Sequence, residues 1–157
     1  FHLLAMPVYS VLPDGKEHAY RFLSADFFAK TYAFIFFLAF PTTNIRPLIN
    51  EHGFWNLFLN LLYRLDAPDN LFPSIHCLIS WLCYVGIRRQ QQLPQAYRLF
   101  VLCMALAICI STLTTKQHVI PDVAAGILLA EFSYWFVHYS HFDWLYAKIF
   151  PIADDYA

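Results

Sequence analysis

Long apolar stretches constrain the fold of this chain more than any other feature. The residues from Phe27 to about Phe40 (FFAKTYAFIFFLAF) include only one charged side chain, and the stretches at about 97–114 and 120–139 are similarly apolar. A transmembrane helix needs roughly 20 apolar residues, and roughly 17 to 25 are tolerated. Hydrophobic residues make up 59% of the chain and charged residues 13%, which is too apolar for an ordinary soluble domain. We therefore expect an all-α, multi-pass transmembrane helix bundle.

The first residues indicate that the bundle continues upstream. Phe1 begins partway through an apolar run, FHLLAMPVYSVLP, which looks like the end of a longer helix. The Pro-Asp-Gly sequence at 13–15 then predicts a polar loop that extends to about Asp26, before the first complete span. We expect a single integral-membrane domain over residues 1–157 that lacks its N-terminal helix or helices.

Further helices are predicted after that span. Residues Gly53–Leu65 have apolar positions at helical spacing but are too few to cross a membrane comfortably, which favours an interfacial or re-entrant helix. Longer helices are expected at about Ser74–Gln92, Tyr97–Thr114 and Ile120–Tyr139. The tail then holds typical anchors of a membrane interface, namely Trp144, Tyr146 and Lys148.

The distribution of basic residues indicates which side of the membrane each end faces. If the spans alternate, seven of the ten basic residues lie on one face and three on the other. The larger group is Lys16, Arg21, Lys30, Arg88, Arg89, Arg98 and Lys148, and the smaller group is Arg46, Arg64 and Lys116. An excess of positive charge in short loops marks the cytoplasmic face. The smaller group, together with His76 and His118, is therefore predicted to lie at the extracytoplasmic membrane surface.

Charge and cysteine usage exclude other classes of protein. The net charge of -1 gives no reason to expect a nucleic-acid partner. The cysteines lie within apolar runs rather than in polar loops, so we interpret them as packing residues and not as a disulfide framework or a zinc site: Cys77, Cys83, Cys103 and Cys109. No metal or cofactor is expected, and the oligomeric state stays open.

The stretch from Ser111 to Gly126 (STLTTKQHVIPDVAAG) carries the chemistry that an apolar chain does not need for folding. His118 and Asp122 are four residues apart, so on a helix they lie on one face, where the carboxylate can accept a proton from one ring nitrogen. That bond would hold one tautomer and leave the other nitrogen free, as a nucleophile requires. Lys116 offers positive charge to an approaching anion. The alternative is a helix that merely begins with a polar cap.

Polar residues of three separated segments are predicted to meet at one membrane face: Arg46, Ser74, His76, Lys116, His118 and Asp122. His76 follows Pro73 and Ser74, which signal a helix start, so it falls beside backbone amides that attract anions. Two cations, a helix N-terminus and two imidazoles suit a phosphate monoester. One histidine would attack phosphorus, and the other would protonate the departing alkoxide.

Three short sequences also carry a resemblance to a known family. FPTTNIRP, FPSIH and STLTTKQHVIPD resemble the motifs K-x6-R-P, P-S-x-H and S-R-x5-H-x3-D of the type-2 phosphatidic acid phosphatase superfamily. The resemblance extends from about Phe27 to about Tyr139. It implies a bundle of membrane helices whose site faces outward, and a metal-independent phosphatase or phosphotransferase that works through a phosphohistidine.

The resemblance also implies a role for each matching residue. His118 is the nucleophile and Asp122 its orienting partner, while His76 protonates the leaving group and later activates water. Phosphate oxygens would be bound by residues at the other motif positions: Arg46, Ser74 and Ser111.

Two positions depart from the family pattern, since Ala39 and Thr112 stand where the motifs have lysine and arginine. Lys116 could replace one of these cations. Sequences of the TKQH type look like the branch that includes inositol- and choline-phosphate transferases, so the acceptor is either water or a lipid or inositol hydroxyl.

A non-enzymatic membrane protein is the contrasting hypothesis. His76, His118 and Asp122 could serve a metal or proton carrier, or a degenerate relative could only bind anionic lipids. Arg46 and Lys116 argue against the metal carrier, because cations repel a metal ion. The expected partners are a lipid phosphate substrate and membrane lipids.

Overall fold

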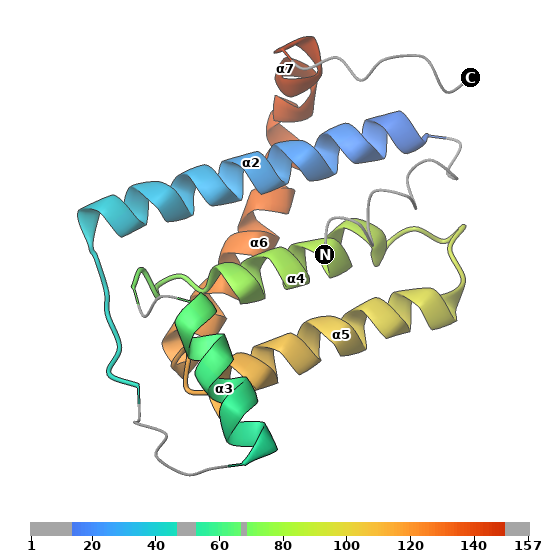
Figure 1. The fold of residues 1–157 in the computed structure, drawn as a ribbon. Coiled ribbons are helices and arrows are strands. Elements are labelled where there is room, and N and C mark those ends of the chain that lie inside the picture. The colour runs from blue at the N-terminus through green and yellow to red at the C-terminus, as the bar shows by residue number, and fades with distance from the viewer. Residues whose placement is uncertain (1–13, 47–52, 67–68, 150–157) are drawn as a thin grey trace.

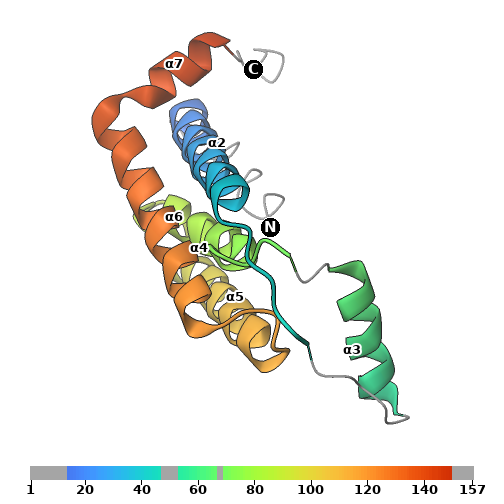
Figure 2. The same ribbon diagram turned by 90° about the vertical axis from the view of Figure 1, so that its left-hand side faces the viewer.

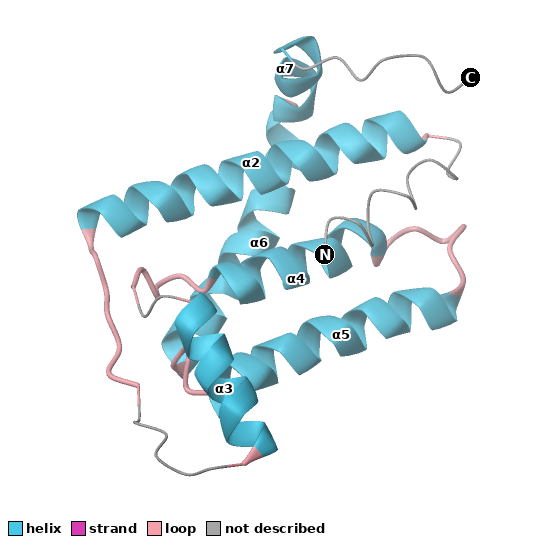
Figure 3. Ribbon diagram, viewed as in Figure 1, coloured by secondary structure: helices cyan, strands magenta, loops and turns pink. Residues whose placement is uncertain are grey.

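The computed structural model describes residues 14–46, 53–66 and 69–149, and in these residues it is built from helices (Figures 1 and 3). The helices are α2 (Gly15–Ala39), α3 (Phe54–Leu65), α4 (Ile75–Ile87), α5 (Gln95–Thr114), α6 (Ile120–Ser140) and α7 (Phe142–Ile149). The described residues form no strand beyond an isolated bridge between Thr43 and Asp69. The predicted all-α bundle is confirmed. The apolar run at the start of the chain lies outside the described residues.

Three helices, α2, α5 and α6, are long and apolar enough to cross a membrane. The α5 helix has 20 residues, which at ~1.5 Å per residue is about the ~30 Å thickness of the hydrocarbon core. The α4 helix is shorter, with 13 residues, and it is surrounded by its neighbours. A chain with these spans is an integral membrane protein.

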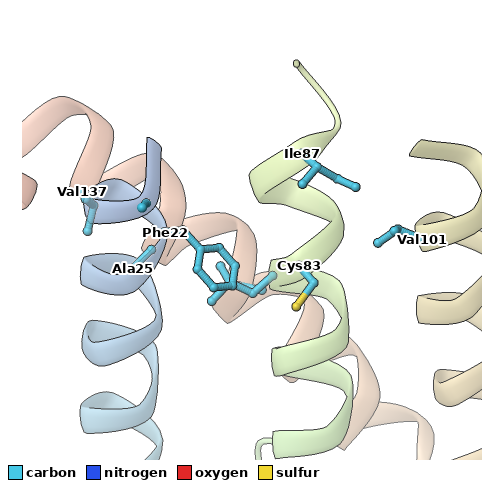
Figure 4. Packing of buried hydrophobic residues seen from close by; sticks show 9 residues of the cluster. Phe22, Ala25, Cys83, Ile87, Val101 and Val137 are labelled. Carbon is cyan, nitrogen blue, oxygen red and sulfur yellow. The ribbon is translucent and has the colours of Figure 1, made fainter. Parts of the chain in front are cut away.

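The short α4 helix forms the centre of the bundle, where it packs against α2, α5 and α6. Side chains from all four helices meet in one apolar cluster (Figure 4). Phe22 of α2 is fully buried there, together with Cys83 and Ile87 of α4 and Val137 of α6. This packing holds the C-terminal half of α4 in place.

The prediction for the start of the first span was wrong, because the polar stretch before Asp26 belongs to α2. Its charged residues are paired along the helix, with Glu17 2.7 Å from Arg21 and Asp26 2.8 Å from Lys30. Both pairs are four residues apart, a spacing that stabilises helices. The small and apolar residues between them, such as Ala19 and Phe22, are buried in the core.

The predicted end of α4 at Gln92 was also wrong, since the helix ends at Ile87. The next residue, Arg88, donates to Glu131 of α6, and the chain turns there. Pro94 then caps α5. The helix gives way to a turn in which the Gln90 amide donates to the Ile87 carbonyl at 3.0 Å, and the ion pair ties this end of α4 to α6.

The α3 helix has the predicted bounds and stands apart from the bundle (Figure 2). None of its residues is buried, and most of its large apolar side chains are exposed: Phe54, Trp55, Leu57, Phe58, Leu61 and Leu65. An amphipathic helix with this surface suits the membrane interface.

One end of the bundle brings the three motif segments together. There α2 and α5 end while α4 and α6 begin (Figure 1). Thr42 Oγ1 accepts hydrogen bonds from the amides of Leu71 and Phe72, at 2.9 and 3.2 Å. Asn44 Nδ2 donates to the Lys116 carbonyl at 3.0 Å. We call this the motif end of the bundle; which side of the membrane it faces stays a prediction.

Candidate functional site

His118 lies in the turn between α5 and α6 and contacts the first residues of α6. Its amide donates to the Thr112 carbonyl at 3.1 Å, which folds the turn back onto the end of α5. The ring Nδ1 is 3.4 Å from Asp122 Oδ2, and both side chains are buried. Asp122 Oδ2 also accepts the Val119 amide at 3.1 Å, so the carboxylate is fixed by the helix start. The imidazole therefore has one nitrogen directed at an acid.

Burial and charge act on His118 in opposite directions. Burial lowers the pKa of His118, because a charged ring is poorly solvated there, while the Asp122 carboxylate raises it. The net effect is a pKa below the ordinary value of 6.5. The lowered pKa favours the neutral ring, the state in which it can act as a nucleophile.

His76, in the first turn of α4, faces His118. The ring centroids are 6.0 Å apart and the ring planes are inclined at 66°. The His76 side chain is 51% exposed, so this ring can meet water and ligands while His118 stays buried. The structure thus places the two predicted histidines side by side at the motif end.

Ser74 and Gly126 fix the approach of α4 to α6. Ser74 is buried, its Oγ accepts the Cys77 amide at 3.4 Å, and its own amide donates to the Asp122 carbonyl at 3.1 Å. Gly126 packs so closely that an added Cβ would lie 2.6 Å from the Ser74 carbonyl oxygen. The α4 helix, which carries His76, and the α6 helix, which follows His118, are therefore held together by backbone contact.

Arg46 reaches the site from the chain after α2, but its guanidinium is occupied. Nη2 donates to Asp66 Oδ2 at 2.8 Å, and Nη1 donates to the Tyr63 carbonyl at 3.3 Å and to the Asp66 carbonyl. The Arg46 side chain is only 8% exposed. In this structure Arg46 holds the end of α3 against the bundle, and a phosphate would reach it only by displacing Asp66.

Asp66 and Gln117 are site residues that the motifs do not identify. Asp66 Oδ2 accepts Gln117 Nε2 at 2.8 Å as well as Arg46, and Asp66 Oδ1 lies 3.7 Å from His76 Nε2. Asp66 belongs to the turn DAPDN, where acidic residues are ordinary. Only the position of Gln117 directly before His118 could have suggested a role.

The remaining predicted residues, Lys116 and Ser111, lie at the same end of the bundle, in the last turn of α5 and the turn that follows it. Lys116 is exposed and has a left-handed backbone with φ of 53°. Ser111 is exposed on the last turn of α5, where its carbonyl accepts the Thr115 amide at 2.9 Å. Thr112 is buried, and its hydroxyl donates to the Cys109 carbonyl at 2.9 Å. An arginine would not fit this buried position.

The cysteines are all free thiols, three of them buried and Cys103 exposed. Cys77 contacts Thr112 at 3.6 Å in the contact of α4 with α5. In the described residues, no group of three or more His, Cys, Asp or Glu side chains is placed to hold a metal ion.

Comparison with protein families matches residues 1–136 of this chain to the PAP2 superfamily. Comparisons with curated proteins and with solved structures gave no match. The match extends over most of the chain and includes all three motif segments, whose polar side chains gather at the motif end. The chain therefore belongs to the PAP2 superfamily.

Proposed function

We propose that this protein is a metal-independent membrane phosphatase that cleaves a lipid phosphate monoester through a phosphohistidine. The observation that carries the proposal is the pair of histidine rings 6.0 Å apart, one buried against a carboxylate and one open to ligands. Family membership supports the same class of reaction.

In the first step, the free nitrogen of His118 attacks phosphorus. The nitrogen donates its electron pair to a new N–P bond, and the bond between phosphorus and the lipid oxygen breaks with its electron pair on oxygen. His76 gives a proton to that oxygen, because an alkoxide is a poor leaving group. Asp122 keeps the His118 ring oriented and stabilises the positive charge that the ring gains.

In the second step, water releases the phosphate. The neutral His76 ring takes a proton from water, the water oxygen attacks phosphorus, and the N–P bond breaks with its electron pair returning to His118. The products are inorganic phosphate and the free lipid alcohol, and both histidines are restored. The exposure of His76 supports this second role.

The phosphate oxygens would be bound by groups around the two rings. The N-terminus of α4, which Ser74 caps, presents backbone amides and a favourable dipole to an anion. Lys116, two residues before His118, would supply positive charge, and Ser111 a hydroxyl. Arg46 would join them only after exchanging Asp66 for phosphate.

An apolar groove supports an amphiphilic substrate. The groove, of about 420 Å³, lies between α2 and α6 and begins beside Pro73, next to Ser74 of the site. It is lined by Tyr32, Phe36, Phe72, Pro73, Ala125, Leu128, Leu129 and Phe132. A lipid could keep its chains against this surface while its phosphate reaches the histidines. By the count of basic residues, the substrate would come from the extracytoplasmic leaflet.

Phosphate release by purified protein tests the proposal. We expect release from phosphatidic acid in the presence of EDTA, inhibition by vanadate, and a loss of at least ~10³-fold in His118→Ala, because the nucleophile is removed. His138→Ala at the other end of α6 is the matched control and should keep full activity. A requirement for added divalent metal, or undiminished activity in His118→Ala, would contradict the mechanism and leave the non-catalytic lipid-binding or carrier hypothesis.

Phosphotransfer to a lipid or inositol hydroxyl is the second candidate. It is favoured by the TKQH sequence before Val119 and by Thr112 in place of the arginine of the third motif. The same phosphohistidine would form, and an alcohol would replace water in the second step. Assays with and without inositol or a lipid alcohol distinguish the two, because transfer gives a new phosphate ester in place of inorganic phosphate.

A further inference from the structure

We propose that Asp66 is a positioning residue that holds the His76 imidazole for proton transfer to the leaving oxygen. The inference rests on the proposed function, since it gives the second histidine an acidic partner as Asp122 is the partner of the first. Asp66 is outside the motifs, at the end of α3.

The two oxygens of Asp66 have different partners. Oδ2 accepts hydrogen bonds from Arg46 Nη2 and Gln117 Nε2, each at 2.8 Å. Oδ1 lies 3.7 Å from His76 Nε2, within the range of an ion pair when the ring carries a proton. The carboxylate is thus fixed through one oxygen and presents the other to the imidazole.

The exposed His76 ring needs a contact that fixes its orientation. The ring is half exposed and lies in the first turn of α4, so packing restrains it less than it restrains the buried His118. A proton donor must lie within hydrogen-bond reach of the atom that it protonates. Asp66 supplies a charged contact from outside α4, which limits the orientations of a ring that would otherwise rotate.

The groups around Asp66 come from all three motif segments. Arg46 comes from the first motif segment, His76 from the second, and Gln117 directly precedes His118 in the third. The Asp66 carboxylate therefore relates the position of His76 to the segment that carries His118. A side chain needed only to secure α3 would require the Arg46 contact alone.

The test uses two phosphate esters that differ in their leaving groups. Departure of an alkoxide from a lipid phosphate needs a proton, whereas nitrophenolate leaves without one. Asp66→Asn should lower kcat/KM for the lipid phosphate by about 10- to 100-fold, part of the ~10²–10⁴-fold that acid catalysis contributes. For nitrophenyl phosphate the loss should be below about 3-fold, because only proton delivery is impaired. The ratio kcat/KM is chosen because it reports steps up to phosphoryl transfer.

Three further variants separate positioning from folding. Asp69→Asn changes an exposed acid of the same turn and should leave kcat/KM unchanged for both esters. Gln117→Leu removes one anchor of Asp66 and should give the same leaving-group-selective loss at smaller size. In a His76→Ala background, Asp66→Asn should add nothing, because residues that act as a unit are non-additive.

Equal losses with both esters, or an additive loss in the His76→Ala background, would mean that Asp66 only secures α3, and the inference would be wrong while the proposed function stands. If the unchanged protein releases phosphate from neither ester, the proposed function fails and this inference fails with it.

Discussion

The two ends of the bundle each contain an arginine paired with a carboxylate, and the pairs differ in what they leave available. At the end away from the motifs, Arg88 donates to both oxygens of Glu131, at 2.6 and 2.7 Å, and Trp81 donates to the same group at 3.0 Å. At the motif end, Arg46 and Gln117 share one oxygen of Asp66, and the other oxygen lies near His76. The first pair ties the end of α4 to α6 and uses both oxygens of the carboxylate in doing so. The second retains an oxygen for another task.

The histidines of the two ends also differ in their burial and in the groups beside them. At the far end, His18 contacts the Gln90 side chain at 3.0 Å and His138 is exposed beside Tyr139. At the motif end, His118 is buried against an acid and faces a second imidazole. A histidine becomes a candidate for catalysis through its neighbours, so substitutions of those neighbours should affect activity at the motif end and not at the other end.

The largest effect is expected from Asp122→Asn. The amide keeps the size of the side chain but cannot stabilise the positive charge that His118 gains when it attacks phosphorus. We expect kcat to fall by about 10²–10⁴-fold, with the larger value corresponding to a ring held in the wrong tautomer. The measurement is steady-state phosphate release from the lipid phosphate.

The matched control is Glu131→Gln, which also changes a carboxylate to an amide on α6, at a position beside Arg88 and away from the two rings. It should keep kcat within about twofold, since the acid touches neither ring. If the two variants lose activity equally, the distinction between the ends would be lost and the acid at Asp122 would have no special part in the reaction.

A smaller loss is expected from Gly126→Ala. The new Cβ would meet the Ser74 carbonyl oxygen at 2.6 Å, so α4 and α6 must separate near the two rings. We expect about 10-fold lower kcat, as misplacement at the site is costly, and a loss of about 1–3 kcal/mol in the free energy of unfolding from overpacking. Ala124→Ser, at an exposed position of the same helix, is the control. Full activity in Gly126→Ala would show that the close helix contact does not set the ring geometry.

The helices that form the fold could be predicted from the sequence more fully than the site. Apolar runs located α5 and α6 to within about two residues, because lipid-facing and core-facing residues are both apolar and the pattern is continuous. The start of α2 could not be located, since the Glu17–Arg21 and Asp26–Lys30 pairs make a helix of a stretch that looks like a loop. Two charged residues four positions apart in a sequence indicate an ion pair only if the segment is already taken to be a helix.

At the site, the short motifs identified side chains but not their partners. His76, His118 and Asp122 lie at one end, as alternation of the spans predicts. The engagement of Arg46 by Asp66 could not be predicted, because the two residues are 20 apart and meet only through the way α3 returns to the bundle. Motif letters describe which groups are present, and long-range contacts decide which of them a ligand can reach.

A change of stability without loss of activity is expected from Glu131→Gln. The variant leaves the Arg88 guanidinium without its carboxylate, and hydrogen bonds to charged groups contribute about 1.5–3 kcal/mol each before solvent screening, which reduces the figure for these part-exposed side chains. We expect a loss of about 1–2 kcal/mol in unfolding free energy, measured by thermal unfolding in detergent. The outcome that contradicts this is a lowered kcat with unchanged stability, which would make the far end part of the catalytic machinery.

The smallest expected effect is a shift in the pH profile of kcat/KM. This shift tests whether the Asp122 carboxylate, and not the Glu131 carboxylate, acts on the histidine that attacks phosphorus. His118 must be neutral to attack, and burial puts its pKa below 6.5, so kcat/KM should be constant near pH 7 and fall only as the pH drops below 6.5. Asp122 raises this pKa, so in Asp122→Asn the acid limb should move to still lower pH, whereas Glu131→Gln should leave it in place. Nitrophenyl phosphate is the appropriate substrate, because its leaving group needs no proton and the profile then reports the nucleophile. An acid limb at or above pH 6.5, or one that moves upward in Asp122→Asn, would mean that the ring whose ionisation controls the reaction is not the buried His118.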